Sequence, residues 1–139
     1  MTELIAKELN PVRLHVKTHP EAMGRFGANW TPTVMILDPN GTERYRIEGY
    51  LPADDFLAQL QMGLAQTAFK TNKFDDAEKR FRAVVDQFPN SEVAPEALYW
   101  AGVSRYKGAN DASALGATAK AFQERYQESP WAKKASIWA

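Results

Sequence analysis

The chain has 139 residues, of which 45% are hydrophobic, and its 17 basic and 17 acidic side chains give a formal net charge of zero. This length fits one domain or two small ones. The balanced charge argues against nucleic acid as a main partner, because such partners favour a basic stripe. There is no cysteine, and no apolar run reaches the ~18 residues of a membrane-spanning helix, so thiol–disulfide exchange within this chain and a membrane span are both excluded.

The amino-terminal residues carry no visible targeting signal. Residues 1–10 include acidic side chains and lack an apolar core of signal-peptide length. The absence of cysteine fits the cytoplasm, but it fits an exported protein equally well. The location is therefore open, with the cytoplasm as the default expectation.

Two short helices and a strand are predicted before residue 30. Residues 2–9 predict the first helix. Residues 12–17, VRLHVK, alternate apolar and polar side chains, which is the pattern of a strand with one buried face. Pro20 suits the start of a second helix over residues 21–26, which stops at Gly27.

The stretch that follows predicts a β-hairpin. Residues 33–37, TVMIL, form the continuous apolar run of a buried strand. Residues 38–41, Asp-Pro-Asn-Gly, have the residue order of a type I turn. Residues 44–50 then alternate, as expected of a half-buried strand near the sheet edge. With residues 12–17, this makes a three-stranded sheet.

From Pro52 onward the apolar residues recur with a helical period. Asp75 and Glu78 stand three residues apart, which resembles a capping box, and Asp111 is a further candidate cap. The pattern predicts one long helix over residues 52–71, then helices over 75–88, 98–107 and 111–126, and a last short helix from Ser129-Pro130.

The run from Phe26-Gly27 to Leu60 resembles the C-terminal half of a thioredoxin. That half has a helix, a Thr-cisPro before a buried strand, a hairpin to an edge strand and a final helix. Here Thr31-Pro32 matches the cis-proline site, and Gly49 matches a small residue near the end of the last strand. The resemblance covers about residues 4–66 and implies a truncated thioredoxin-like domain over residues 1–66.

The departure from the thioredoxin pattern has two parts. The Cys-x-x-Cys motif is missing, and the family's first strand, first helix and second strand would all lie upstream of Met1. In a whole thioredoxin, the strands that match residues 12–17 and 33–37 flank a central strand, which is absent here. Unpaired strand edges recruit other chains, so we expect a homodimer through the open sheet edge, unless residues 12–17 close directly on the hairpin.

A repeat is visible in the second half of the chain. Residues 83–94 align with residues 121–132 in steps of small and apolar side chains. The first copy resembles a tetratricopeptide repeat, whose usual period is about 34 residues. A TPR-like domain is therefore expected over residues 57–139, sharing the long helix with the first domain; a generic α-hairpin bundle is the alternative. Segments of this region look like the repeats of bacterial envelope-assembly proteins. The pattern of the first copy is carried by Leu64, Ala65, Ala68, Ala77, Phe81 and Pro89.

Few residues suggest chemistry. His15 and His19 share no helical face, so no metal site is expected. The acidic pairs Asp54-Asp55 and Asp75-Asp76 suit helix N-termini. No phosphate-binding loop and no serine-hydrolase motif is present, so we expect neither enzymatic activity nor a cofactor.

Two peptide-binding sites are predicted. The thioredoxin resemblance implies one at Trp30, Thr31 and Pro32, because the backbone before the cis-proline pairs with a bound peptide in that family. The concave side of a helical repeat is the other, since solenoids hold extended peptides there. Its candidates are Met62, Gln66, Phe69, Tyr99, Val103 and Tyr106. If the register is off by one, the helix presents Trp100, Ser104 and Lys107 instead.

Together, these patterns predict an α+β chain: a truncated, three-stranded thioredoxin-like sheet with helices, followed by a TPR-like helical array. The predicted function is a non-catalytic module that binds a protein or peptide and associates with itself. The alternative is a C-terminal fragment of a thiol–disulfide oxidoreductase whose Cys-x-x-Cys lies upstream of Met1.

Overall fold

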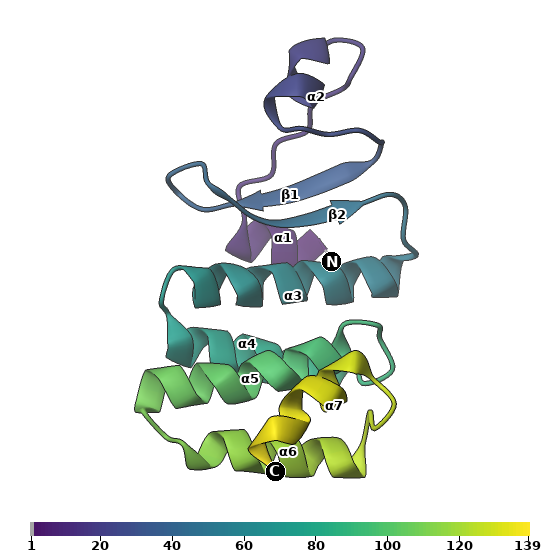
Figure 1. Cartoon of the computed structure of the whole chain (residues 1–139). Coiled ribbons are helices and arrows are strands. Elements are labelled where there is room, and N and C mark those ends of the chain that lie inside the picture. The colour runs from purple at the N-terminus through teal and green to yellow at the C-terminus, as the bar shows by residue number, and fades with distance from the viewer. Residues whose placement is uncertain (1) are drawn as a thin grey trace.

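The computed structural model describes residues 2–139, so Met1 lies outside the described part of the chain. A short hairpin lies over a stack of helices, with α2 above the hairpin and α3 to α6 below it in Figure 1. The described elements are α1 (Thr2–Glu8), α2 (Pro20–Arg25), β1 (Thr33–Leu37), β2 (Glu43–Glu48), α3 (Ala53–Lys70), α4 (Phe74–Gln87), α5 (Ala94–Ala109), α6 (Ser113–Glu124), α7 (Pro130–Ala135) and the 3-10 helix η1 (Ser136–Trp138).

The long helix α3 lies between the sheet and helices α4 to α7 (Figure 1). Leu60, Gly63 and Leu64 are buried on one side, and Gly63 faces Ile36 of β1 and Tyr45 of β2. On the opposite side, Met62 belongs to the core of the helical region. A helix that is apolar on both sides is buried on both sides, which explains why apolar residues recur along the whole length of α3.

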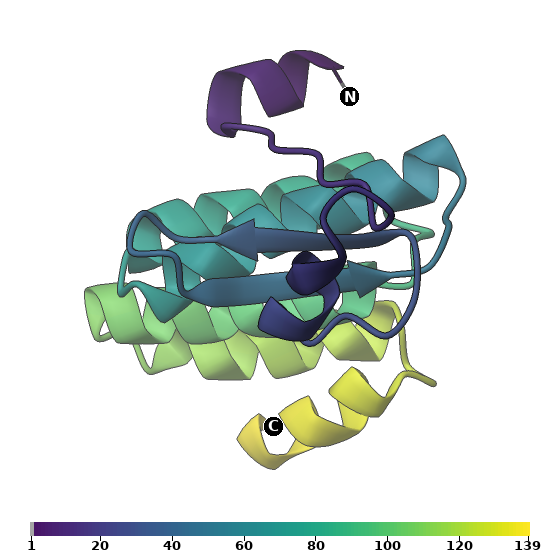
Figure 2. The same cartoon turned by 90° about the horizontal axis from the view of Figure 1, so that it is seen from above.

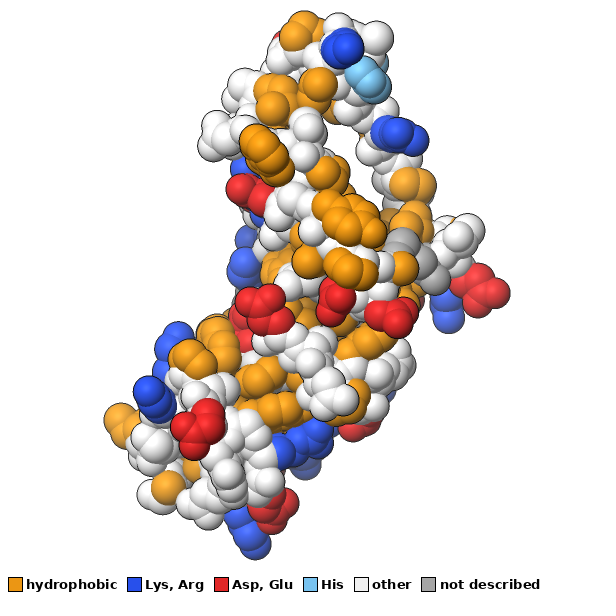
Figure 3. Space-filling model, turned by 90° about the vertical axis from the view of Figure 1, so that its right-hand side faces the viewer, with side chains coloured by type: hydrophobic (Ala, Val, Ile, Leu, Met, Phe, Trp, Pro, Cys, Tyr) orange, Lys and Arg blue, Asp and Glu red, His pale blue; other side chains and the backbone are white. Residues whose placement is uncertain are grey.

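The prediction of a strand over residues 12–17 is wrong. The segment has no regular strand, and a turn closes where the amide nitrogen of His19 donates to the carbonyl of His15 at 2.8 Å. Val12, Leu14 and Val16 are exposed. Figure 3 shows the chain between α1 and α2 standing clear of the hairpin, with open space between them. An extended segment needs a hydrogen-bonding partner to become a strand, and alternation alone does not supply one.

The described sheet therefore has two strands, paired antiparallel with Val34 opposite Ile47. The predicted turn is confirmed, because the amide of Gly41 donates to the carbonyl of Asp38 at 2.9 Å and Gly41 has a φ of 82°. Only a glycine adopts that φ at little cost. The fold class is mixed helix and sheet, as predicted, but the three-stranded sheet is not found.

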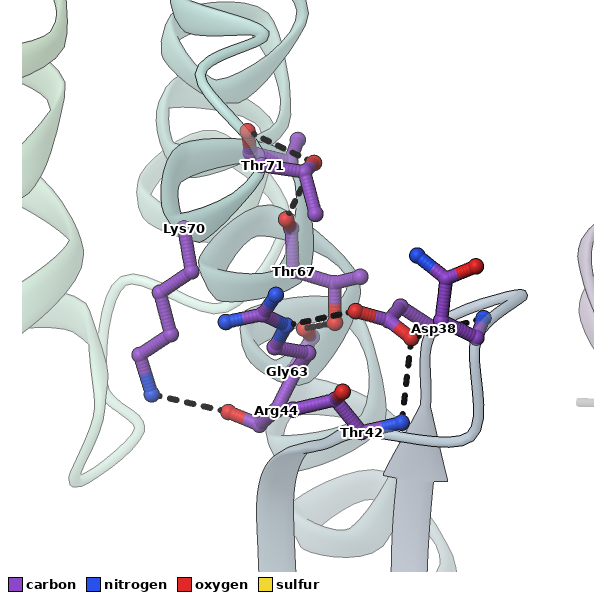
Figure 4. A network of polar contacts seen from close by, with 9 residues as sticks. Asp38, Thr42, Arg44, Gly63, Thr67, Lys70 and Thr71 are labelled. Carbon is purple, nitrogen blue, oxygen red and sulfur yellow. Dashed lines mark hydrogen bonds and ion pairs between the residues drawn. The ribbon is translucent and has the colours of Figure 1, made fainter.

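A polar network holds the turn against α3 (Figure 4). The Asp38 carboxylate accepts from the amides of Asn40 and Thr42 and from Arg44 Nε at 2.9 Å. The bond from the Thr42 amide is the main reason why the pKa of Asp38 lies below its ordinary value. Lys70 Nζ donates to the Arg44 carbonyl at 2.8 Å, so the end of α3 is tied to β2.

The remaining helices pack as successive antiparallel neighbours, α3 on α4, α4 on α5 and α5 on α6, which is the arrangement of stacked helical hairpins. Several helix boundaries differ from the predictions, among them the starts of α4 and α5. Helix α4 begins at Phe74 without a side-chain cap, so the predicted capping box does not form. Helix α5 begins at Ala94, four residues early, because Pro95 suits the first turn. The predicted start of the last helix is confirmed, since the Ser129 hydroxyl accepts from the Ala132 amide.

The core of the helical part is made of small side chains around a few large ones. Phe81 of α4 and Met62 of α3 are fully buried, and alanines let the helices approach closely. None of the described helices is long and apolar enough to cross a membrane.

Candidate peptide-binding site

The Thr31–Pro32 segment lies at the surface, directly before β1. Its peptide bond is cis, the isomer that the resemblance implies. The Pro32 carbonyl accepts from the Gly49 amide at 2.7 Å, and the Thr33 hydroxyl donates to the Trp30 carbonyl at 2.6 Å. Trp30 is 66% exposed, so it does not pack into the core, and no backbone bond of Thr31 to another described residue is found.

A second candidate site is an aromatic cluster, which we define as Phe69, Tyr99, Trp100, Trp131 and Trp138. Trp100 of α5 lies 5.0 Å from Phe69 of α3 and 6.2 Å from Trp131 of α7, measured between ring centroids. Tyr99 lies 4.9 Å from Trp138, in a stacked arrangement. All five rings are partly buried. The cluster therefore joins α3, α5, α7 and η1 with rings that still reach the surface.

Some of the residues predicted for the helical groove are buried in the core, and others reach the surface. Met62 is fully buried and Gln66 is 6% exposed, so both lie in the core and not on a groove. They are on the side of α3 that packs against the other helices, where the sequence alone did not fix the register. Tyr106 is exposed and Val103 is half-buried. Phe69 and Tyr99 are the two predicted residues that meet in the aromatic cluster.

The three residues of the alternative register also lie in different environments. Trp100 belongs to the aromatic cluster, as that register required. Ser104 is fully buried and its hydroxyl donates to the Trp100 carbonyl. Lys107 is exposed and its Nζ lies 5.6 Å from the centroid of the Phe74 ring. Helix α5 thus contributes residues of both registers to its contacts, because neighbouring helices pack on more than one of its sides.

Charged groups surround the aromatic cluster. Lys134 Nζ lies 4.1 Å from the centroid of the Trp131 ring, a cation–π contact. Burial is the main reason why the pKa of Glu96 is raised, and the positive charges of Lys134 and Lys70 oppose the shift. Trp100 Nε1 is buried and does not meet hydrogen-bond geometry with any described acceptor, Glu96 included. Burial, with Glu96 and Glu92 nearby, raises the pKa of Tyr45 to about 12.

The raised pKa of Glu96 gives a prediction about stability. A carboxyl group with a higher pKa in the folded state binds its proton more tightly there, so the free energy of unfolding falls as the pH rises from the ordinary pKa through the raised one. Glu96→Gln should remove this loss and stabilise the protein at pH 7. Urea unfolding from pH 4 to pH 8 measures this change in the free energy of unfolding. Glu92→Gln is the control, because Glu92 is an exposed acid four residues before Glu96. Equal pH profiles for wild type and Glu96→Gln would contradict the assignment.

The described residues hold no group of three or more potential metal ligands. His15 and His19 are both exposed, and the His15 ring accepts from the Lys17 amide. The acidic pairs Asp54-Asp55 and Asp75-Asp76 lie in the first turns of α3 and α4. This position is favourable for acidic side chains by itself, so it requires no ligand.

A cavity of about 440 Å³ lies away from the aromatic cluster, between α4, α5 and α6. Its charged rim is paired internally, since Glu78 contacts Arg82 at 2.8 Å and Arg105 at 3.7 Å, and Arg105 also contacts Asp111. A charged ligand would have to displace these pairs. The aromatic cluster is therefore the better candidate for binding.

Sequence reasoning missed Trp131 and Trp138 as members of the site. The sequence did contain a signal for Trp131, because the repeat alignment pairs Trp131 with Val93, which directly precedes α5. That alignment put α7 in line with α5, but it did not say that α7 packs beside Tyr99.

Two family models match the chain. A thioredoxin-like domain matches residues 5–63, and a tetratricopeptide repeat matches residues 57–91. The predicted resemblance to both families is thereby confirmed, and the chain combines a thioredoxin-like segment with a TPR segment. The two matches overlap within α3, the helix that contacts both the sheet and α4. A search of curated proteins and a search of solved structures found no match.

Proposed function

We propose that the chain is a non-catalytic module that binds an extended segment of a partner protein at the aromatic cluster. The observation that carries the proposal is that three of the four tryptophans gather with Tyr99 and Phe69 across α3, α5 and α7 while remaining partly exposed. Tryptophan and tyrosine are the residues that most often dominate binding energy at interfaces. A TPR segment is in keeping with a protein partner.

The aromatic cluster supplies both of the features that such a site needs. Its rings are held against one another, so little conformational entropy is lost when a ligand covers them. Lys134, over the Trp131 ring, and Glu96, near Trp100, offer polar groups at its border. A peptide could place an apolar side chain on the rings and pair its backbone or charges with the border.

Trp131→Ala tests the proposal. Peptides selected from a random display library on the wild-type chain should bind the variant about thirtyfold more weakly or worse, the loss typical of an interface hot spot. The measurement is fluorescence anisotropy of a labelled selected peptide. Because Trp131 is partly buried, far-UV circular dichroism of the variant must first show that the helices are intact.

Trp30→Ala is the matched control. It removes the same kind of side chain from the exposed position beside Pro32. If binding is lost in Trp30→Ala and kept in Trp131→Ala, the peptide site lies at Thr31–Pro32 and the aromatic cluster is not the site. If neither variant changes the affinity, the proposal fails.

The second candidate function is a fragment of a thiol–disulfide oxidoreductase. The exposed cis Thr31–Pro32 segment favours it, because the thioredoxin resemblance implies that substrate peptides pair there. This chain has no cysteine, so the reactive motif would have to come from upstream of Met1. A Trp-Cys-x-x-Cys in the reading frame upstream would support this candidate, and an upstream frame without it would support the binding module.

We also propose that the chain self-associates as a homodimer. The support is the two-stranded sheet, whose strands each have an outer edge without a partner among the described residues. Such edges pair readily with other chains. Light scattering over a tenfold or larger range of concentration tests it, and a monomer throughout that range would contradict it.

A further inference from the structure

The outer edge of β1 has backbone groups that point away from β2. The Pro32 carbonyl accepts from the Gly49 amide, and Val34 lies opposite Ile47 in the same register. Residues that exchange bonds across an antiparallel pair alternate with residues that face outward. Thr33 and Met35 therefore direct their amides and carbonyls to the open side of the sheet.

The segment from Pro11 to Lys17, which we call the strap, has the sequence of a strand but lies outside the sheet. It alternates apolar and polar residues like a strand but pairs with no strand among the described residues. Val12, Leu14 and Val16 are 80%, 44% and 37% exposed. The strap stands clear of the hairpin in Figure 3. Its apolar face is thus in water, beside a sheet that lacks a neighbour.

The strap is held at both ends within its own chain. On one side, Glu8 of α1 pairs with Arg80 of α4 at 3.1 Å. On the other side, Arg46 of β2 donates to the carbonyl of Gly27, just after α2, at 3.0 Å. Both contacts anchor elements that flank the strap, and Figure 3 shows open space between the strap and the hairpin of its own chain.

We propose that two copies exchange their straps, so that residues 12–17 of each copy pair as a strand with the open edge of β1 of the other. This inference rests on the self-association proposed above and names the segment that carries it. The contact is the same in both directions, as a two-fold dimer requires. The sheet of each copy gains a third strand.

The chemistry of the strap fits this position. Val12, Leu14 and Val16 would continue the inward face of Val34 and Ile36 over the helices, and Arg13, His15 and Lys17 would point to solvent. A whole second sheet does not fit the same edge as well, because α1 lies on that side of β1 in Figure 2. A single extended segment carries no helix layer with it.

Leu14→Pro is the first test. Proline removes a backbone donor and fixes φ, so the strap cannot form a paired strand, and the dimer dissociation constant from light scattering should rise about a hundredfold or more. The monomer should be unaffected, because Leu14 lies outside every helix and strand. Leu14→Val keeps the strand propensity and is the matched control, with the dimer retained.

Disulfide trapping identifies the partner of the strap, and it is clean because the chain has no cysteine of its own. His15→Cys and Met35→Cys place thiols on the outer face of the strap and of β1. When the two single variants are mixed and oxidised, a mixed disulfide dimer is expected. In a double variant, a disulfide within one chain would instead show that the strap closes on its own β1, which overturns the exchange.

The outcomes separate the inference from the proposed function. A dimer that survives Leu14→Pro and forms no mixed disulfide overturns strap exchange and leaves self-association standing. A monomer at every concentration overturns both. Peptide binding at the aromatic cluster is measured independently, by the Trp131→Ala variant.

Discussion

Phe81→Ala should destabilise the protein by about 3–5 kcal/mol, the usual cost of removing a buried phenylalanine. Phe81 is fully buried in α4, and its ring lies 6.5 Å from Phe69 of α3 between centroids. The alanines around it are already small, so the neighbouring helices have few side chains that can turn into the space. Since a domain is stable by only about 5–15 kcal/mol, this single change should remove a large part of the total.

Urea unfolding followed by circular dichroism measures this effect, with the slope of the transition held as a check on two-state behaviour. Ile137→Ala is the matched control, because Ile137 is 82% exposed and its loss should cost under about 0.5 kcal/mol. A loss below about 1 kcal/mol for Phe81→Ala would contradict the packing described for α3, α4 and α5.

Phe69 connects this core to the proposed binding site. Its ring contacts Phe81 on one side and Trp100 of the aromatic cluster on the other. Phe81→Ala should therefore also loosen the cluster and weaken peptide binding, even where most molecules remain folded. Binding energy at the surface depends on rings that are already fixed, and the buried ring of Phe81 helps to fix them.

The elements predicted correctly are those whose signals are local. The turn from Asp38 to Gly41 is set by residues that hydrogen-bond to one another, and the helices from Ala53 onward follow from period and proline positions. These signals act within a few residues. The exact helix starts were less predictable, because α4 begins at Phe74 without the capping box that the pattern suggested, and α5 begins at Ala94 with Pro95 in its first turn.

The predictions that failed depended on a partner far away in the sequence. The strap alternates like a strand, but a strand exists only when another segment offers its backbone. In the same way, Met62 and Phe69 are seven residues apart on one helix, yet one is core and the other reaches the surface. Only the position of α5 and α7 decides between them.

Gly63→Ala should open the contact between the sheet and α3. A Cβ built on Gly63 would lie 2.4 Å from Ile36 Cδ1 and 2.7 Å from Tyr45 Cδ2, both far inside normal contact. Tyr45 cannot turn away freely, because its hydroxyl donates to Gln59 of α3, the helix that contains Gly63. Overpacking of this kind costs about 1–3 kcal/mol. The better helix propensity of alanine returns only about 1 kcal/mol.

Gly116→Ala is the control for helix propensity. Gly116 is also in a helix, but its nearest neighbour beyond that helix, the Trp138 carbonyl oxygen, is 3.8 Å from the built Cβ. This variant should be as stable as the wild type or more so. A Gly63→Ala protein that behaves in the same way would contradict the close approach of β1 and β2 to α3.

Ile36→Val identifies the atom responsible. It removes Ile36 Cδ1, so the Gly63→Ala change should cost less in the Ile36→Val background than in the wild type, and the double-mutant cycle should give a coupling of about 0.5–3 kcal/mol. Hydrogen exchange then locates the damage. Amides of β1 and β2 should exchange faster in Gly63→Ala while those of α4 and α5 keep their protection, because the clash acts on the sheet side of α3 and the helical core lies on the other.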